Sequence, residues 1–508
     1  MAIDDRTAAE TAAETATETA TETAEDTAGT AGTAPASPES PGSPESPGPR
    51  STWAALRPLL LRLHFYAGLL IAPLLLIAAT TGLLYALSFQ AEKIVYRHEL
   101  QVPAGDRVLP LSEQVAAARE AHPDGTVTAV WPSPEDGATT RVLMAHPSVE
   151  EGKSLAVFVD PYTAEVRGDL PSYGSSGALP LRAWISEFHR TLHLGDLGRN
   201  YSEMAASWLW VVALGGLALW IGRRRTAKRR LVLPERGAPS RRRTLSWHGS
   251  VGLWAVTGLV ILSATGLTWS RYAGENIDAV QSQLGGATPT VSATLDGAAP
   301  GGGADGHEGH GGGHHTAPAP QGPDIGIDKA VEAARATGVD GRIAVTLPAD
   351  GNAYVVKQTD TQFPVHLDSV AIDPADGRVV DELRFADYPV LAKLTRYGID
   401  LHMGVTFGLA NQLVLAALMV ALVLLTVWGY RMWWLRRPTK ERTLSAGRAM
   451  PRGAWRKVPV TLLLPLAAAT ALVGWFVPML GISLLVFLAV DITLGLVARS
   501  RARTGAEA

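Results

Sequence analysis

Six apolar runs of membrane-spanning length constrain this chain more than any other feature of its 508 residues. A helix needs about 20 mostly apolar residues to cross the hydrocarbon layer of a bilayer. Residues 69–87, inside the first run, carry no charged side chain, which is unusual for a buried helix of a soluble protein. The sequence therefore predicts a membrane protein. The predicted spans are Leu63–Phe89, Ala205–Ile221, Trp247–Trp269, His402–Trp434, Val458–Phe476 and Leu480–Val497.

Basic clusters beside the spans predict the orientation of the chain, because Lys and Arg gather on the cytoplasmic side of membrane proteins. Six crossings place all four clusters on one side, so both termini are predicted to be cytoplasmic. Topology explains these clusters without nucleic-acid binding. The clusters lie at residues 57–62, 223–243, 431–457 and 499–503.

The predicted domain organisation follows from the spans. Residues 1–52, rich in Ala, Thr, Glu, Ser and Pro, are expected to form a disordered cytoplasmic tail. Residues 90–203 and 272–400 are expected to form two extracytoplasmic domains. The remaining predicted segments are transmembrane helices at 53–89, 204–222, 247–271 and 401–435, basic cytoplasmic links at 223–246 and 436–457, a transmembrane hairpin at 458–498 and a cytoplasmic tail at 499–508.

A repeated pattern joins the first and third spans. His64-x3-Gly-Leu matches His248-x3-Gly-Leu, and the tripeptide Thr-Gly-Leu begins 17 residues after each histidine, at Thr81 and at Thr265. Histidines at matching positions of two long apolar segments indicate an internal duplication.

The segments before the second and fourth spans share a shorter motif. Leu-His-Leu-Gly at 192–195 resembles Leu-His-Met-Gly at 401–404, which aligns His193 with His402. His189 lies one helical turn before His193. It has no counterpart in this alignment, because Gly398 occupies the corresponding place.

These histidines lie at the ends of apolar helices, where opposed neutral imidazoles can hold haem iron. The predicted topology puts His64 and His248 near the cytoplasmic face, and His193 and His402 near the outer face. About 45 Å of helix separates His193 from the basic end of its span, so one haem cannot reach both faces. We therefore expect two haem b groups, one for each pair. His189 is an alternative outer ligand, a ligand to another cofactor, or a hydrogen-bonding partner of a ligand.

The absence of cysteine limits the redox chemistry of the chain. Disulfides, cysteine-held iron–sulfur clusters and thioether-attached haem are excluded, so any haem is held non-covalently. The chain also lacks a glycine-rich fingerprint for NAD or flavin, which implies a separate cytoplasmic or quinol electron donor.

Small and basic residues near the histidines have two interpretations each. Glycines could let a flat macrocycle approach the helix backbone, or could serve only helix packing; they are Gly68, Gly82, Gly252 and Gly266. Arginines could pair with haem propionates, or could only anchor the chain at the membrane surface; they are Arg62, Arg190, Arg243 and Arg396.

A second group of histidines lies in a loop rich in Gly and Pro within residues 301–322. The loop is typical of weak metal-binding composition, and a flexible linker with incidental histidines explains it equally well. Its histidines are His307, His310, His314 and His315.

Each outer segment is predicted to be a small α+β domain. Amphipathic helices are expected at Leu111–Ala121 and Ile327–Ala336, and strands at Leu155–Val159 and Val370–Ile372. Each strand runs into a similar turn, Asp-Pro-Tyr-Thr-Ala-Glu-Val from Asp160 and Asp-Pro-Ala-Asp-Gly-Arg-Val from residue 373. These turns resemble those of the PepSY domain.

The order helix–PepSY–helix with these histidines resembles the PepSY-associated transmembrane family, often called iron-regulated membrane proteins, over about residues 55–436. The first turn departs from the family pattern at Ala164, where glycine is usual. The resemblance implies a mainly α membrane protein with α+β extracytoplasmic domains. Duplicated helix–PepSY–helix units would form a four-helix core, followed by a C-terminal transmembrane hairpin. Several relatives act as haem-containing inner-membrane reductases linked to ferric siderophore use.

The leading functional hypothesis is a bis-haem b oxidoreductase in the cell membrane. It would pass electrons across the bilayer to a ferric chelate or siderophore in iron acquisition. A transporter for haem, metal or metal chelate is a second hypothesis, although the repeats are parallel and carry no broken helix at mid-membrane. A non-catalytic regulator of an extracytoplasmic enzyme is a third, and it leaves the repeated histidines without a role.

Overall fold

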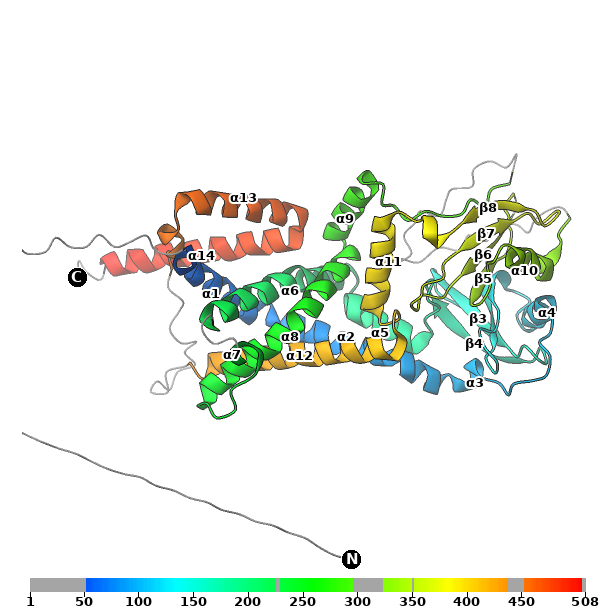
Figure 1. The fold of residues 1–508 in the computed structure, drawn as a ribbon, viewed down its shortest axis with the longest axis horizontal. Coiled ribbons are helices and arrows are strands. Elements are labelled where there is room, and N and C mark those ends of the chain that lie inside the picture. The colour runs from blue at the N-terminus through cyan, green and yellow to red at the C-terminus, as the bar shows by residue number, and fades with distance from the viewer. Residues whose placement is uncertain (1–51, 225–228, 296–322, 350, 437–451, 505–508) are drawn as a thin grey trace, which may run out of the picture. The chain divides into compact units, whose positions relative to one another are not determined.

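A computed structural model describes residues 52–224, 229–295, 323–349, 351–436 and 452–504, and it contains long helices and one antiparallel sheet (Figure 1). Among these residues, five helices are long and apolar enough to cross a membrane. The chain is therefore a multi-pass membrane protein. The five helices are α2 (Ala72–Val95), α6 (Gly195–Arg224), α8 (Ser240–Thr268), α12 (Gly408–Trp434) and α14 (Pro478–Thr504).

The first predicted span differs from the structure, because two helices occupy it. Helix α1 (Thr52–Leu70) ends just before Ile71, and α2 follows with Pro73 in its first turn. Proline has no N–H, so it cannot donate to the carbonyl four residues earlier, and it kinks a helix. That carbonyl belongs to Leu69, and the hydroxyl of Tyr430 donates to it at 3.0 Å. The kink is thus stabilised by a contact from α12.

The fourth predicted span also differs. Helix α11 (Val390–Met403) contains His402 and ends at Gly404 in the left-handed conformation, with φ +85°. The span itself is α12, which begins at Gly408. A short helix, α5 (Pro180–Thr191), precedes α6 in the same way. His402 therefore lies in a short helix before the span and does not open the span.

Helices α2, α6, α8 and α12 pack against one another through α2–α12, α6–α8, α8–α12 and α2–α6 contacts. Buried apolar side chains such as Leu75, Trp208, Leu259 and Leu422 form one cluster among them. Helix α13 (Val460–Phe476), which is 17 residues long, pairs with α14. The remaining short helices are α3 (Arg97–Leu100), α7 (Arg229–Val232), α9 (Tyr272–Gln283), η1 (Phe385–Asp387) and η2 (Ala454–Lys457).

The two outer segments form one eight-stranded antiparallel sheet. The segments meet where Ala129 pairs with Thr346 and Val130 with Val345. The sequence predicts two separate domains, whereas this strand pairing joins the two segments in a single sheet. The strand order is β4 (Val166–Tyr173), β3 (Lys153–Val159), β2 (Thr140–Ala145), β1 (Thr126–Trp131), β5 (Ile343–Thr346), β6 (Tyr354–Gln358), β7 (Ser369–Ile372) and β8 (Val379–Leu383).

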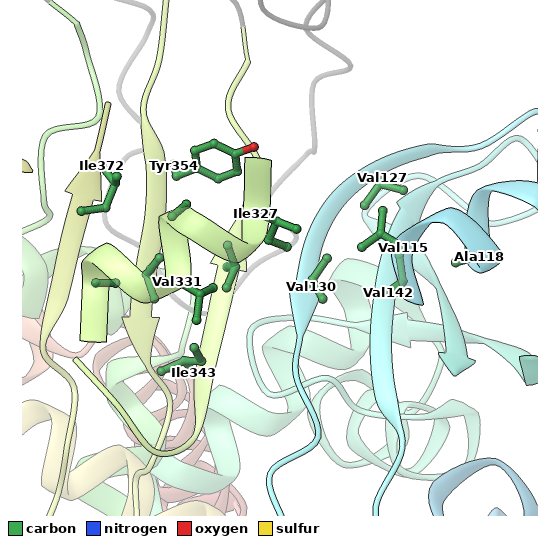
Figure 2. Close-up of a cluster of buried hydrophobic side chains, with 14 of the residues drawn as sticks. Val115, Ala118, Val127, Val130, Val142, Ile327, Val331, Ile343, Tyr354 and Ile372 are labelled. Atoms are coloured by element: carbon green, nitrogen blue, oxygen red, sulfur yellow. The ribbon is translucent and has the colours of Figure 1, made fainter. Parts of the chain in front are cut away.

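Helices α4 (Leu111–Ala121) and α10 (Gly326–Ala336) pack on the sheet, and both agree with the predicted amphipathic helices. Their apolar faces share one buried cluster with the strands, which includes Val115 and Val331 (Figure 2). The carboxylate of Asp328 in α10 accepts a hydrogen bond from the backbone N–H of Leu111 at 2.7 Å. A negative side chain at a helix N-terminus stabilises unpaired N–H groups, so α10 caps α4.

The two predicted turns adopt the same conformation. Asp160 and Asp373 each accept a hydrogen bond from the backbone N–H two residues later, at 2.8 and 2.9 Å. The left-handed position is occupied by Gly377, with φ +80°, in one turn and by Ala164, with φ +60°, in the other. The departure from the usual glycine therefore places an alanine in a conformation that L-residues disfavour.

Exchanging these two residues tests this backbone strain. The left-handed conformation costs an L-residue roughly 1–2 kcal/mol, so Ala164→Gly is expected to raise the unfolding free energy by up to about 1 kcal/mol after the entropy of glycine is subtracted. Gly377→Ala is expected to lower it, because an added Cβ would also lie 3.3 Å from Cδ1 of Ile325. Thermal unfolding of the purified protein measures both changes. A lower melting temperature for Ala164→Gly would contradict the argument.

Candidate functional site

Two imidazoles meet between α1 and α8. The ring centres of His64 and His248 are 6.3 Å apart, with an angle of 74° between the ring planes. Nδ1 of His64 lies 3.1 Å from the backbone oxygen of Val212 in α6, and Nδ1 of His248 lies 3.0 Å from that of Leu425 in α12. A carbonyl can only accept a hydrogen bond, so each Nδ1 carries the proton. Nε2 is then the nitrogen with a free lone pair.

This separation fits a shared metal ion. A bond between a metal and an imidazole nitrogen is about 2 Å long, and the ring centre lies about 1 Å behind the nitrogen, so two imidazoles on opposite sides of one ion have centres about 6 Å apart. Histidine ligands usually donate the other ring N–H to a carbonyl or carboxylate, which fixes the ring and its tautomer. His64 and His248 meet both conditions. We name them the inner pair, and use inner and outer for the two faces predicted from the basic clusters.

A second pair of imidazoles follows the same rule with threonines as partners. Nδ1 of His189 in α5 lies 2.8 Å from Oγ1 of Thr81, and Nδ1 of His402 in α11 lies 2.7 Å from Oγ1 of Thr265. Each threonine hydroxyl also lies within hydrogen-bonding distance of backbone carbonyls one turn earlier in its own helix. Because the hydroxyl proton goes to a carbonyl, the threonine oxygen accepts the Nδ1 proton, and Nε2 again keeps its lone pair. We name His189 and His402 the outer pair.

The outer imidazoles are neutral at pH 7. Burial lowers the pKa of His189 to about 4, and the neighbouring charge of Arg190 acts in the same direction. Burial is the main cause that lowers the pKa of His402 to about 3, and the charge of His189 contributes in the same direction. Neutral imidazole is the form that binds a metal.

The structure places His193 differently from the sequence prediction. Helix α5 ends at Thr191, so His193 falls in the turn before α6, with φ +55°. Its exposed ring packs on the side chains of Trp184 and Phe188, with ring centres 4.8 and 5.9 Å apart. Of the two histidines His189 and His193, the first contacts a threonine of the Thr-Gly-Leu tripeptides, so it is the stronger candidate ligand.

The structure therefore does not favour the alignment of His193 with His402, in which Gly398 replaces His189. Equivalent positions of α6 and α12 give a different alignment of the two halves. Positions that have the same role in α6 and α12 are 213 residues apart: Val212 and Leu425 both accept from a histidine, and Gly195 and Gly408 are the first residues of the two helices. The same spacing pairs His189 with His402. The Leu-His-x-Gly motif misleads because α11 extends through its copy of the motif, whereas α5 ends before it.

Several site residues could not be identified from the histidine pattern. The carbonyls of Val212 and Leu425 carry no side-chain signal, and Gly216 lies outside the repeated His-x3-Gly-Leu pattern. A Cβ at Gly216 would lie 2.8 Å from Cε1 of His64. Gly216 and Gly429 are again 213 residues apart, so an alignment of the spans by their glycines could have found this position.

The predicted glycines fall into two groups. A Cβ at Gly82 would lie 3.3 Å from Cε1 of His189, and a Cβ at Gly266 would lie 3.6 Å from Cε1 of His402, so both adjoin the outer pair. An added Cβ at Gly68 would meet no described atom within 4 Å, and one at Gly252 would meet only Leu425, at 3.7 Å. Of these four glycines, only Gly82 and Gly266 lie close to a histidine ring.

Three of the four predicted basic partners of haem propionates have acidic neighbours in the structure. Arg62 pairs with Asp491, Arg190 with Glu187 at 3.0 Å, and Arg396 with Asp400 at 2.8 Å. Arg243 is exposed at the start of α8. Propionate pairing therefore stays a prediction for all four arginines.

The histidine-rich loop with His307, His310, His314 and His315 lies outside the described residues. Within the described part of the chain, no group of three or more His, Asp or Glu side chains is arranged to hold a metal ion. The paired histidines are therefore the best-supported candidate ligands there.

Apolar spanning helices, a joined antiparallel sheet and paired imidazoles define a multi-pass membrane protein with an α+β region. The chain belongs to the family described as the PepSY-associated TM region, whose model matches residues 61–436. The resemblance drawn from the Asp-Pro turns and the His-Gly helices is thereby confirmed. A comparison with curated proteins gives no match.

Proposed function

We propose that the protein is a bis-haem b oxidoreductase that carries electrons across the cell membrane. The observation that carries this proposal is the shared arrangement of the four paired histidines. Each imidazole has its Nδ1 proton bound by a partner on another helix and its Nε2 free. The donor set and the 6.3 Å separation of the inner rings fit a bis-imidazole haem iron.

In this proposal the chain is a duplicated helix–PepSY–helix unit around a four-helix core. His64 and His248 would hold one haem near the cytoplasmic side, and His189 and His402 would hold the other near the outer side. The basic links set this orientation by the positive-inside rule, with both termini in the cytoplasm and the sheet outside.

The residues of the chain have distinct tasks in this activity. Val212 and Leu425 orient the inner imidazoles through their carbonyls, and Thr81 and Thr265 orient the outer ones. The surrounding apolar side chains exclude water, which favours neutral imidazoles and limits side reactions. When bound, haem supplies one-electron chemistry through its iron, and the protein sets its position and surroundings.

A cytoplasmic or quinol donor and an outer ferric chelate, such as a siderophore complex, are the proposed partners. Fe(II) binds hard oxygen ligands less tightly than Fe(III), so reduction outside the membrane would release iron from an oxygen-rich chelator. Iron acquisition is the biological role that fits this chemistry.

An absorption spectrum with a counted haem content tests the proposal. The purified protein is expected to contain about two haem b per chain, with bands that change on addition of dithionite and return when a ferric chelate is added. Free haem in the same detergent is the control for unspecific uptake. A colourless protein that binds no added haem would reject the oxidoreductase proposal, and the transporter and regulator hypotheses would then remain.

A further inference from the structure

The C-terminal hairpin of α13 and α14 begins beyond the residues matched by the family model, yet polar contacts attach it to the other helices. The Asn276 side chain donates to the backbone oxygen of Phe476 at 2.9 Å, and the indole N–H of Trp208 donates to the Ser483 hydroxyl at 2.8 Å. Asp491 pairs with Arg62 of α1. Ser483 and Asp491 are eight residues apart, so they lie on one side of α14.

The contact at Asp491 is an ion pair in a sparsely hydrated place. The side chain of Arg62 is 11% exposed and that of Asp491 is 24% exposed. Arg452 adds a second hydrogen bond to Oδ1 of Asp491, at 2.9 Å. Beside the pair, the rings of Tyr66 and Phe487 lie 5.4 Å apart. Charged groups inside a membrane helix are costly unless paired, and loss of one partner leaves the other uncompensated.

Arg62 lies two residues before His64 in α1, and a step of two residues turns a helix by about 200°. His64 therefore faces His248 while Arg62 faces α14. The kink at Pro73 separates α1 from α2, so the direction of α2 alone does not fix α1. Helix α1 packs on α6 and on η2, and the Arg62–Asp491 pair joins it to α14.

The second half of the chain holds its inner histidine by another contact. Ser246 lies two residues before His248, and its hydroxyl accepts a hydrogen bond from the backbone N–H of Glu235 at 2.9 Å. The segment between α6 and α8 thus contacts α8 beside His248, just as the hairpin contacts α1 beside His64. We therefore expect the hairpin to matter for His64 and not for His248.

We propose that Asp491 is a positioning residue for His64: by pairing with Arg62, the hairpin keeps α1 at the angle that brings the His64 imidazole opposite His248. The contact of the hairpin with α1 through Asp491 and Arg62, which we call docking, does not depend on haem. Its effect on haem rests on the function proposed above.

Cross-linking tests the docking step without haem. The chain has no cysteine, so a short thiol-specific reagent can join Tyr66→Cys to Phe487→Cys. The matched pair is Trp208→Cys with Ser483→Cys, which lies nearer the start of α14. Asp491→Asn is expected to slow the first cross-link at least tenfold and to leave the second unchanged. Equal rates with and without Asp491→Asn would overturn the proposal.

Electron paramagnetic resonance tests the consequence for His64. The signal that His248→Ala removes is assigned to the inner pair. Asp491→Asn is expected to shift or abolish that signal only, and Asp491→Glu to restore it. Arg452→Gln, which keeps the Arg62–Asp491 pair, is expected to retain the signal.

The outcomes separate the two proposals. A wild-type protein without haem, but with the expected cross-linking, rejects the oxidoreductase function and supports the docking of the hairpin. Two haem signals that are both unchanged in Asp491→Asn would overturn the positioning role of Asp491.

Discussion

His189→Ala is expected to remove about half of the bound haem, whereas His193→Ala leaves the haem content unchanged. The first substitution deletes the imidazole held by Thr81, the proposed partner of the imidazole held by Thr265. The second deletes an exposed ring that packs on Trp184 and Phe188. Only the first removes a candidate axial ligand of iron.

Haem per chain, measured from the reduced-minus-oxidised spectrum, checks this prediction. His402→Ala should reproduce the loss seen in His189→Ala, and the double variant should lose no more than either single variant, because one pair serves one haem. If His193→Ala causes the loss and His189→Ala does not, the ligand assignment from the structure is wrong and the alignment by the Leu-His-x-Gly motif is correct.

Gly216→Leu is expected to eliminate the inner haem. Even the first carbon of the new side chain would lie 2.8 Å from Cε1 of His64, well inside van der Waals contact. The ring cannot move freely, because its Nδ1 proton is held by the carbonyl of Val212 in the same helix as Gly216. The larger side chain therefore displaces the imidazole from its place opposite His248.

Gly215→Leu is the matched control, because an added Cβ at Gly215 meets no described atom within 4 Å. It changes the same helix by the same side chain one position earlier, and it should keep both haems. Spectra of Gly216→Leu and His64→Ala should coincide, with about half the wild-type haem. Full haem content in Gly216→Leu would show that His64 does not bind haem in the observed position.

The outer sheet shows how far local patterns can be trusted. The helix at Leu111–Ala121, the strand ending at Val159 and both Asp-Pro turns agree with prediction, because each depends on periodicity or on turn chemistry within a few residues. Such patterns do not predict the pairing of β1 with β5. It joins residues more than 200 positions apart, and no local pattern encodes which edge strands meet.

The sequence by itself determined that the chain spans a membrane, since length and apolarity are local properties that lipid selects directly. It also determined that histidines recur near the ends of the apolar segments. Only the tertiary structure decided that His189, and not His193, corresponds to His402. That choice depends on where α5 ends relative to Thr81, and helix ends are set by packing as well as by composition. The carbonyls of Val212 and Leu425 became recognisable as partners only once other helices had brought imidazoles to them.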